Sequence, residues 1–123
     1  MPELNKVLIA GRLTEDPNIK YTSDRLAVAS VKIAVNHYTK DKQESAVSYF
    51  DVIAYGRVAE FIREYIKKGN QILVDGKLHQ IRYNVKSGTE EKTRSKIEIV
   101  ANSIFPMNSH INKTIEEEGI FEY

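Results

Sequence analysis

The sequence predicts an all-β fold, a small Greek-key barrel of five strands with one helix between the third and fourth strands. Two observations lead to this class. Apolar and polar residues alternate along five separate segments, which is the two-residue period of strands that bury one face. One further segment, residues 57–68, carries its apolar residues at the spacing of a helix instead.

The first two predicted strands lie on either side of a turn at Asp16-Pro17-Asn18. Residues 5–13 form the first strand, whose core-facing residues are Val7, Ile9 and Leu13. Residues 26–38 form the second strand, whose core-facing residues are Ala29, Val31, Ile33 and Val35. The opposite faces carry mainly polar and basic residues, so we expect each strand to cover a core on one side only.

The third predicted strand, residues 48–56, reads SYFDVIAYG and follows a polar loop over residues 39–46. Its core-facing residues are Phe50, Val52 and Ala54. The opposite face carries two tyrosines six residues apart, Tyr49 and Tyr55. A core does not account for these two rings, so they are the first candidates for a functional surface.

The predicted helix over residues 57–68 has an apolar face and a face that carries glutamates. The apolar residues are Val58, Phe61, Ile62, Tyr65 and Ile66. Lys67 and Lys68 suit the negative C-terminal end of the helix dipole, and Gly69 suits the left-handed residue that ends many helices.

Two more strands follow the helix. Residues 70–83 form the fourth strand, whose core-facing residues are Ile72, Val74 and Leu78. Residues 94–105 form the fifth strand, whose core-facing residues are Ile97, Ile99 and Ala101. Between them, residues 84–92 are expected to form an exposed hairpin tip with its turn at Ser87-Gly88. Five strands with a helix after the third is the order of elements in the OB fold, a barrel that commonly binds oligonucleotides.

Composition limits the class of function. The chain has 123 residues, enough for one domain, and it contains no cysteine, which excludes disulfides, thiol nucleophiles and thiolate metal sites. The three histidines are scattered, and nothing in the sequence brings Asp51 and Asp75 together as a carboxylate pair. We therefore expect no enzyme, no metal and no cofactor. No apolar run approaches membrane-spanning length, so we expect a cytoplasmic protein without membrane contacts.

Charge is distributed unevenly along the chain. Residues 1–106 hold 17 Lys and Arg against 13 Asp and Glu, a net charge of +4, whereas residues 107–123 have a net charge of −3. The basic part suits a polyanionic partner. The sequence therefore predicts one domain over residues 1–106, followed by a short, acidic, disordered tail over residues 107–123.

Tyrosines and basic residues are interleaved on the faces that do not point to the core. Four tyrosines lie on such faces or at strand ends: Tyr38, Tyr49, Tyr55 and Tyr83. Six basic residues lie among them: Lys6, Arg12, Lys32, Lys77, Arg82 and Lys86. Single-stranded nucleic acid needs this combination, because unstacked bases lie on flat rings while cations follow the phosphates. Exposed tyrosines also occur as ordinary strand residues or in subunit interfaces, so these alternatives stay open.

Four segments give the chain a resemblance to the bacterial single-stranded DNA-binding protein family: LNKVLIAGRLTEDPNIKY, AVASVKIAVN, SYFDVIAYGRVAEFIREYIKKGNQILVDGKL and IEIVANSI. The resemblance implies an OB fold that assembles as a homotetramer and wraps single-stranded DNA. It also implies protection of DNA in replication, recombination and repair, in association with the nucleoid. By position it implies base stacking on Tyr49, Tyr55 and Tyr83, and on Tyr38 near the end of the second strand. The family often has tryptophan at such positions, and this chain contains none, so tyrosine supplies the large rings.

The tail carries an acidic run that leads into an apolar pair. Its residues are Glu116, Glu117, Glu118, Ile120 and Phe121. Such a segment can dock on a partner protein, and the resemblance implies replication and repair proteins as partners. Two other functions stay open: an RNA-binding or primosome-type OB protein, and an OB module used only for oligomerisation or protein docking.

Overall fold

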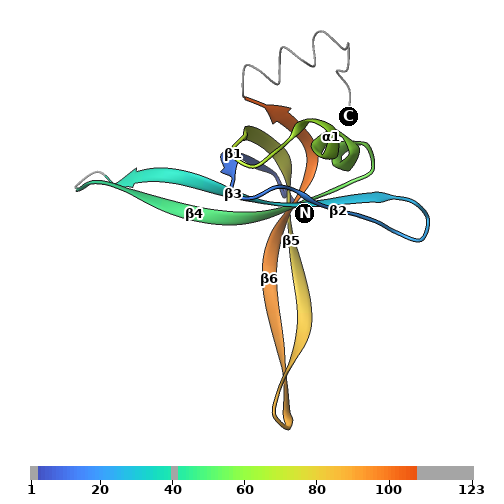
Figure 1. The fold of residues 1–123 in the computed structure, drawn as a ribbon. Helices are drawn as coiled ribbons and strands as arrows, with labels where there is room; N and C mark the ends of the chain where they lie inside the picture. Colours follow the sequence, from blue (N-terminus) through green and yellow to red (C-terminus); the bar gives the residue numbers. More distant parts are fainter. Residues whose placement is uncertain (1–2, 40–41, 108–123) are drawn as a thin grey trace.

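The computed structural model describes residues 3–39 and 42–107, and of residues 38, 39 and 42–45 it describes the backbone only. The strands are β1 (Val7–Leu13), β2 (Asn18–Tyr21), β3 (Ala27–Thr39), β4 (Lys42–Tyr55), β5 (Gln71–Ser87) and β6 (Glu90–Pro106). The helix, α1 (Arg57–Tyr65), lies between β4 and β5 (Figure 1). The all-β class is confirmed, but the described residues form six strands rather than the five predicted.

The sheet closes on itself to form a barrel. Its strands follow the order β1-β5-β6-β4-β3-β2, and β1 also pairs with β3, where Leu13 lies opposite Ile33. The ring therefore runs from β1 through β5, β6, β4 and β3 back to β1, with β2 added outside it. β4 and β6 pair in parallel, with Val52 beside Ile99. This closure leaves few open strand edges and gives the barrel a continuous outer surface.

β2 is the strand that the sequence analysis missed. It pairs with β3 in a hairpin, with Ile19 opposite Ala29. The hairpin turns at Arg25, whose φ of 66° lies in the left-handed region, and the Leu26 N–H donates to Thr22 Oγ1 at 3.1 Å. Four residues are the shortest run over which alternation indicates a strand, so the sequence pattern favoured a turn there.

The core fills the barrel and continues under α1. The largest fully buried side chains are Ile33, Ile62, Ile66, Ile72, Ile104, Val52 and Val74. The helix buries four residues against the barrel: Val58, Ala59, Phe61 and Ile62. Burying one side chain of this size contributes about 1.5–3 kcal/mol, so this core supplies most of the stabilisation that holds the outer surface in place.

The helix ends three residues before the predicted boundary. Ile66 is already extended, with φ −106° and ψ 129°. Two side chains accept hydrogen bonds from the next N–H groups: Asn70 Oδ1 from Lys67 at 2.6 Å, and Asp16 Oδ1 from Lys68 at 2.9 Å. The loop after β1 therefore holds the end of the helix, and helical periodicity alone does not encode such a tertiary contact.

The β3–β4 and β5–β6 hairpins extend beyond the barrel as arms, and the β2–β3 hairpin also projects from it (Figure 1). The β3–β4 arm includes residues 42–46, which the sequence predicted as loop, and the β5–β6 arm includes most of residues 84–92, which it predicted as a hairpin tip. The predicted turn at Ser87-Gly88 is confirmed, with Gly88 at a φ of 67°.

Three predicted core residues are exposed where the arms leave the barrel. They are Phe50 (37% exposed), Leu78 (47%) and Ile97 (61%). The two-residue alternation continues along the arms, but no opposite wall of the barrel covers the apolar face there. The sequence period therefore identified the face correctly and its burial wrongly.

The barrel closes tightly where the β5–β6 register shifts between Asp75 and Gly76, with the extra residue, Asn102, on β6. A Cβ atom at Gly76 would overlap the backbone carbonyl of Val100 on β6. Only glycine fits this position without displacing one of the two strands.

Candidate nucleic-acid interface

The outer face of β4 carries the two tyrosines of the SYFDVIAYG segment. Val52 and Ala54 point into the core and are at most 2% exposed, so Tyr49 and Tyr55 point outward, where they are 63% and 45% exposed. Six residues of strand separate them by roughly 20 Å. The two rings therefore stand at opposite ends of one exposed strand face.

A cation lies in the same cross-strand row as each tyrosine. Arg12 on β1 pairs with Ala34 on β3, which pairs with Tyr49, and all three residues share the outer face. Arg12 Nη1 also donates to the Gly69 carbonyl at 2.8 Å, which fixes the guanidinium. With strands about 4.8 Å apart, Arg12 stands roughly 10 Å from Tyr49 across the sheet.

Lys20 occupies the corresponding position near Tyr55. It pairs with Val28 on β3, and Val28 pairs with Tyr55. Lys20 is exposed and was not among the predicted site residues, because its outward direction follows only once β2 is recognised as a strand.

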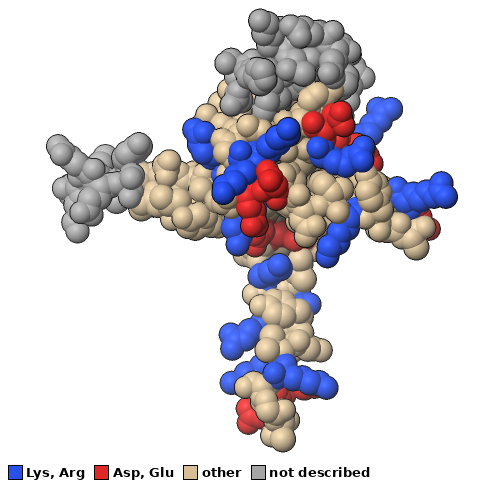
Figure 2. Space-filling view, in the orientation of Figure 1, with Lys and Arg blue, Asp and Glu red and all other residues tan. Residues whose placement is uncertain are grey.

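Tyr83 lies on one face of the β5–β6 arm together with three cations. It is 42% exposed and stands directly opposite Arg94. Lys92 and Lys96 lie two residues to either side of Arg94, so alternation brings them to the same face. Figure 2 shows basic side chains along this arm, which points downward in the view. The sequence analysis missed these cations, although the alternation in KTRSK carried the signal.

The other predicted cations of the β5–β6 arm point away from Tyr83. Arg82 and Lys86 occupy the alternate positions on β5, and Lys86 Nζ lies 3.9 Å from Glu91 Oε1 on the same face. Arg82 and Lys86 therefore lie on the opposite face of the arm from Tyr83, and their contact with nucleic acid stays a prediction.

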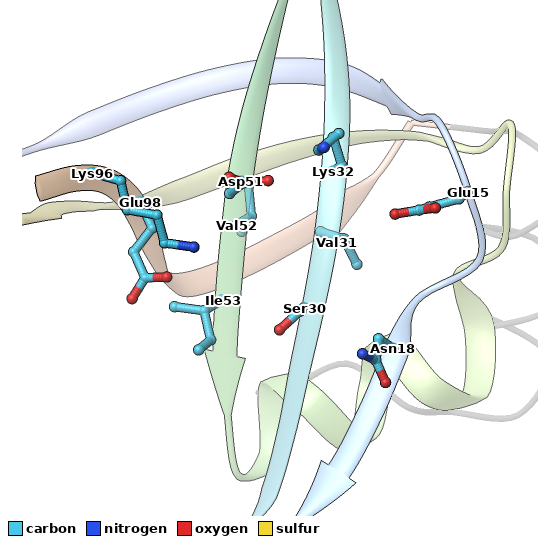
Figure 3. A pocket seen from close by; sticks show the side chains of 10 residues that line it. All are labelled: Glu15, Asn18, Ser30, Val31, Lys32, Asp51, Val52, Ile53, Lys96 and Glu98. Atoms are coloured by element: carbon cyan, nitrogen blue, oxygen red, sulfur yellow. The ribbon is translucent and has the colours of Figure 1, made fainter. Parts of the chain in front are cut away.

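A groove of about 350 Å³ joins the tyrosine-bearing faces into one surface (Figure 3). Asp51 and Ile53 reach it from the Tyr49 and Tyr55 face of β4, and Lys96 and Glu98 reach it from the Tyr83 face of β6. Lys32 and Ser30 line it from β3. Glu15 lines it from the loop after β1, and Asn18 lines it from the start of β2. We call this continuous surface, with Tyr49, Tyr55, Tyr83 and the groove, the tyrosine surface.

The remaining predicted residues lie in different surroundings. Lys77 pairs with Val100, which lies beside Ile53, so Lys77 belongs to the tyrosine surface. Lys6 instead makes an ion pair with Asp75, with Nζ 2.8 Å from Oδ1. Tyr38 lies near the end of β3, opposite Ser45, but its side chain is not described. The tail residues Glu116, Glu117, Glu118, Ile120 and Phe121 lie outside the described residues.

Two kinds of site do not occur in the described part of the chain. No group of three or more histidine and carboxylate side chains there is arranged to hold a metal ion. No helix over residues 3–39 and 42–107 is long and apolar enough to cross a membrane. What the tyrosine surface offers is flat rings, cations and a polar groove.

Comparison with known proteins gives one family. A family model described as "Single-strand binding protein family" matches residues 4–107. The single-stranded DNA-binding protein of Treponema pallidum is 38% identical over 98% of this chain and 68% of its own. Single-stranded DNA-binding protein 2 of Chlorobaculum tepidum is 35% identical over 99% of this chain and 84% of its own. The single-stranded DNA-binding protein of Oceanobacillus iheyensis is 34% identical over 82% of this chain and 62% of its own.

Solved structures of similar proteins have the same fold. The single-stranded DNA binding protein from Thermus aquaticus is similar with a TM-score of 0.71 and 28% identity, over 86% of this chain and 51% of that one. A Plasmodium falciparum SSB in complex with single-stranded DNA superposes with a TM-score of 0.75 over 88% of this chain and 98% of that one. At 24% identity, this second likeness establishes the fold alone.

Proposed function

The chain belongs to the single-strand binding protein family, and on that premise we propose that it binds single-stranded DNA without dependence on sequence. One observation supports the mechanism: Tyr49, Tyr55 and Tyr83 are exposed on strand faces whose other residues line one groove. A base stacked on an exposed ring contributes about 1–3 kcal/mol, and every base has a face that can stack. Three such positions give affinity while leaving sequence largely unread.

Cations beside the rings take the phosphates in this proposal. Arg12 and Lys20 flank the β4 tyrosines through their cross-strand rows, and Arg94 lies opposite Tyr83. When the bases lie on the rings, the phosphates between them run along the protein surface, where these side chains can contact them. Lys6 contributes less, because Asp75 already neutralises it.

We propose that the working unit is a homotetramer. Apolar side chains that a lone barrel leaves in water support assembly: Leu4 (92% exposed), Leu8 (65%) and Ile97 (61%). Covering them in a contact between copies would remove this apolar area from water. Several barrels in a fixed relation also give a long DNA strand a path that one barrel lacks.

The cellular role that follows is protection of single-stranded DNA in replication, recombination and repair, at the nucleoid. It is a binding role without chemistry on the DNA. Glu116, Glu117 and Glu118 with Ile120 and Phe121 are the residues proposed to recruit replication and repair proteins.

Titration with oligo-dT while tyrosine fluorescence is recorded tests the function. The chain has seven tyrosines and no tryptophan, so the signal has no tryptophan background. The proposal predicts strong quenching that saturates at a fixed ratio of DNA to protein. Competition by an RNA oligonucleotide of the same length and sequence (U for T) then decides between DNA and RNA as the preferred ligand. If neither the DNA nor the RNA oligonucleotide quenches the fluorescence or binds, the remaining alternative is an OB module used only for oligomerisation or protein docking.

A further inference from the structure

The groove at the centre of the tyrosine surface carries negative charge where the proposed ligand is a polyanion. Three carboxylates line it: Glu15, Asp51 and Glu98. Figure 3 shows them on three different segments around the groove, with Lys32 and Lys96 among them. Carboxylates repel phosphates, so the DNA backbone is disfavoured inside the groove. A nucleobase is neutral and is not repelled.

The polar groups of the groove are not occupied by one another. Asp51 and Lys32 pair directly across β4 and β3, yet among the described residues no ion pair within 4.0 Å joins them. The Glu98 side chain is only 10% exposed, and its single polar contact in the described part of the chain is with His79 Nδ1, at 3.5 Å. Asp51, Lys32 and Lys96 therefore make no ion pair in the described part of the chain, and Glu98 keeps its second carboxylate oxygen available beside the contact with His79.

The bases differ in what they offer to such a groove. Carboxylates accept hydrogen bonds from amines, as Asp and Glu do from the N4 amine of cytosine. Cytosine, adenine and guanine each carry an exocyclic amine, whereas thymine and uracil carry carbonyl oxygens in its place. A carboxylate beside a carbonyl oxygen is repulsive, so this groove distinguishes the two kinds of base.

We propose that the groove is a base-sensitive subsite that favours nucleobases with an exocyclic amine, with Asp51 and Glu98 as acceptors. Lys32 and Lys96 meet the carbonyl or ring nitrogen of the same base or the phosphate beside it. This inference rests on the proposed function, since it places one base of a bound strand in the groove. Stacking at the tyrosines stays indifferent to sequence, while this one subsite reads the amine.

A pair of ligands that differ mainly at one position tests the proposal. Oligo-dC and oligo-dU of equal length differ in the amine or carbonyl at C4, with the linked proton at N3. The measured quantity is the ratio of their affinities for the wild-type chain, compared with the same ratio for Asp51→Asn and Glu98→Gln. An amide both donates and accepts, so each variant should lower the dC-to-dU ratio by about threefold or more.

The ratio separates base reading from general charge. Removing any acidic charge strengthens binding of both polyanions alike and leaves their ratio unchanged. Glu64→Gln is the matched control, because Glu64 is an exposed residue of α1 outside the groove and its loss removes the same charge. Asp51 is exposed, so Asp51→Asn is expected to fold even if Glu98→Gln does not.

The outcomes distinguish the two proposals. If the wild-type chain binds neither oligonucleotide, the proposed function itself fails and the subsite fails with it. If both bind but Asp51→Asn has the wild-type ratio, the subsite is wrong and the stacking surface stands. A ratio that falls in Asp51→Asn and stays constant in Glu64→Gln supports the subsite.

Discussion

Tyr83 on β5 stands directly opposite Arg94 on β6, so a flat ring and a guanidinium share one face of the β5–β6 arm. Arg82, the neighbour of Tyr83 in the sequence, points to the other face. In this pairing, a base of single-stranded DNA can stack on the Tyr83 ring while its phosphate contacts the Arg94 guanidinium. We therefore expect the cations on the face of Tyr83, rather than Arg82, to contact the DNA phosphates.

We expect the salt dependence of DNA binding to follow the Tyr83 face. The double variant Arg94→Gln with Lys96→Gln should reduce the slope of log affinity for oligo-dT against log salt by up to about 1.4, at about 0.7 for each phosphate contact. The matched control, Arg82→Gln with Lys86→Gln, removes the same two residue types from the opposite face and should keep most of the slope. Equal losses in the two variants would contradict the assignment of faces.

Gly76 should be essential to the stability of the barrel. Gly76→Ala forces a methyl group against the Val100 carbonyl, and overpacking of this kind costs about 1–3 kcal/mol in the free energy of unfolding. Chemical denaturation measures the loss. Gln80→Ala, an exposed position farther along β5, should leave the unfolding midpoint nearly unchanged. A wild-type midpoint in Gly76→Ala would mean that the two strands separate there at little cost.

Assembly should be sensitive to a charge at an exposed apolar position of β1. Light scattering of the wild-type chain should give about four times the chain mass of 14.1 kDa. Leu8→Glu should lower that mass, because Leu8 is 65% exposed in the single chain and a buried charge opposes association. Ser23→Glu, in the exposed β2–β3 turn, is the control and should keep the wild-type mass. A monomeric wild-type chain at micromolar concentration would refute the tetramer.

Removing the acidic end of the chain should slightly tighten DNA binding at low salt. Residues 114–123 hold four glutamates and no basic residue, so their carboxylates compete with phosphates for the barrel's cations. The chain without residues 114–123 should still give about four times its own mass in light scattering, and it should lose binding to replication and repair proteins from the same cell. Unaltered DNA affinity at low salt, together with full retention of those partners, would leave the tail without either role.

The sequence predicted the elements that bury a face and failed where tertiary contacts decide. Alternation identified Val52 and Ala54 as core and Tyr49 and Tyr55 as exposed, because a strand of a barrel has two unlike sides. It did not reveal that Phe50 lies where no opposite wall covers it, or that Asp16 holds the end of α1.

The candidate site was predicted in its rings and only partly in its cations. Tyr49, Tyr55 and Tyr83 carry their own signal as large rings on exposed strand faces. The alternation in KTRSK indicates that Arg94 shares a face with Lys92 and Lys96, but only cross-strand pairing shows that this is the face of Tyr83. Lys20 likewise reaches the row of Tyr55 only through pairing, and a one-residue change of register would move each cation to the other face. The groove could not be predicted from the sequence, because the residues that line it come from segments far apart in the chain.

The central claim is that bases stack on three tyrosines of one surface, and oligo-dT affinity of single tyrosine variants tests it most directly. Tyr49→Ala, Tyr55→Ala and Tyr83→Ala should each weaken binding by about 1–3 kcal/mol, while the corresponding Phe variants, which keep the ring, should lose much less. Tyr21→Ala is the control, because Tyr21 is 51% exposed but faces the side opposite to Tyr55. Wild-type affinity in all three alanine variants would contradict the stacking surface.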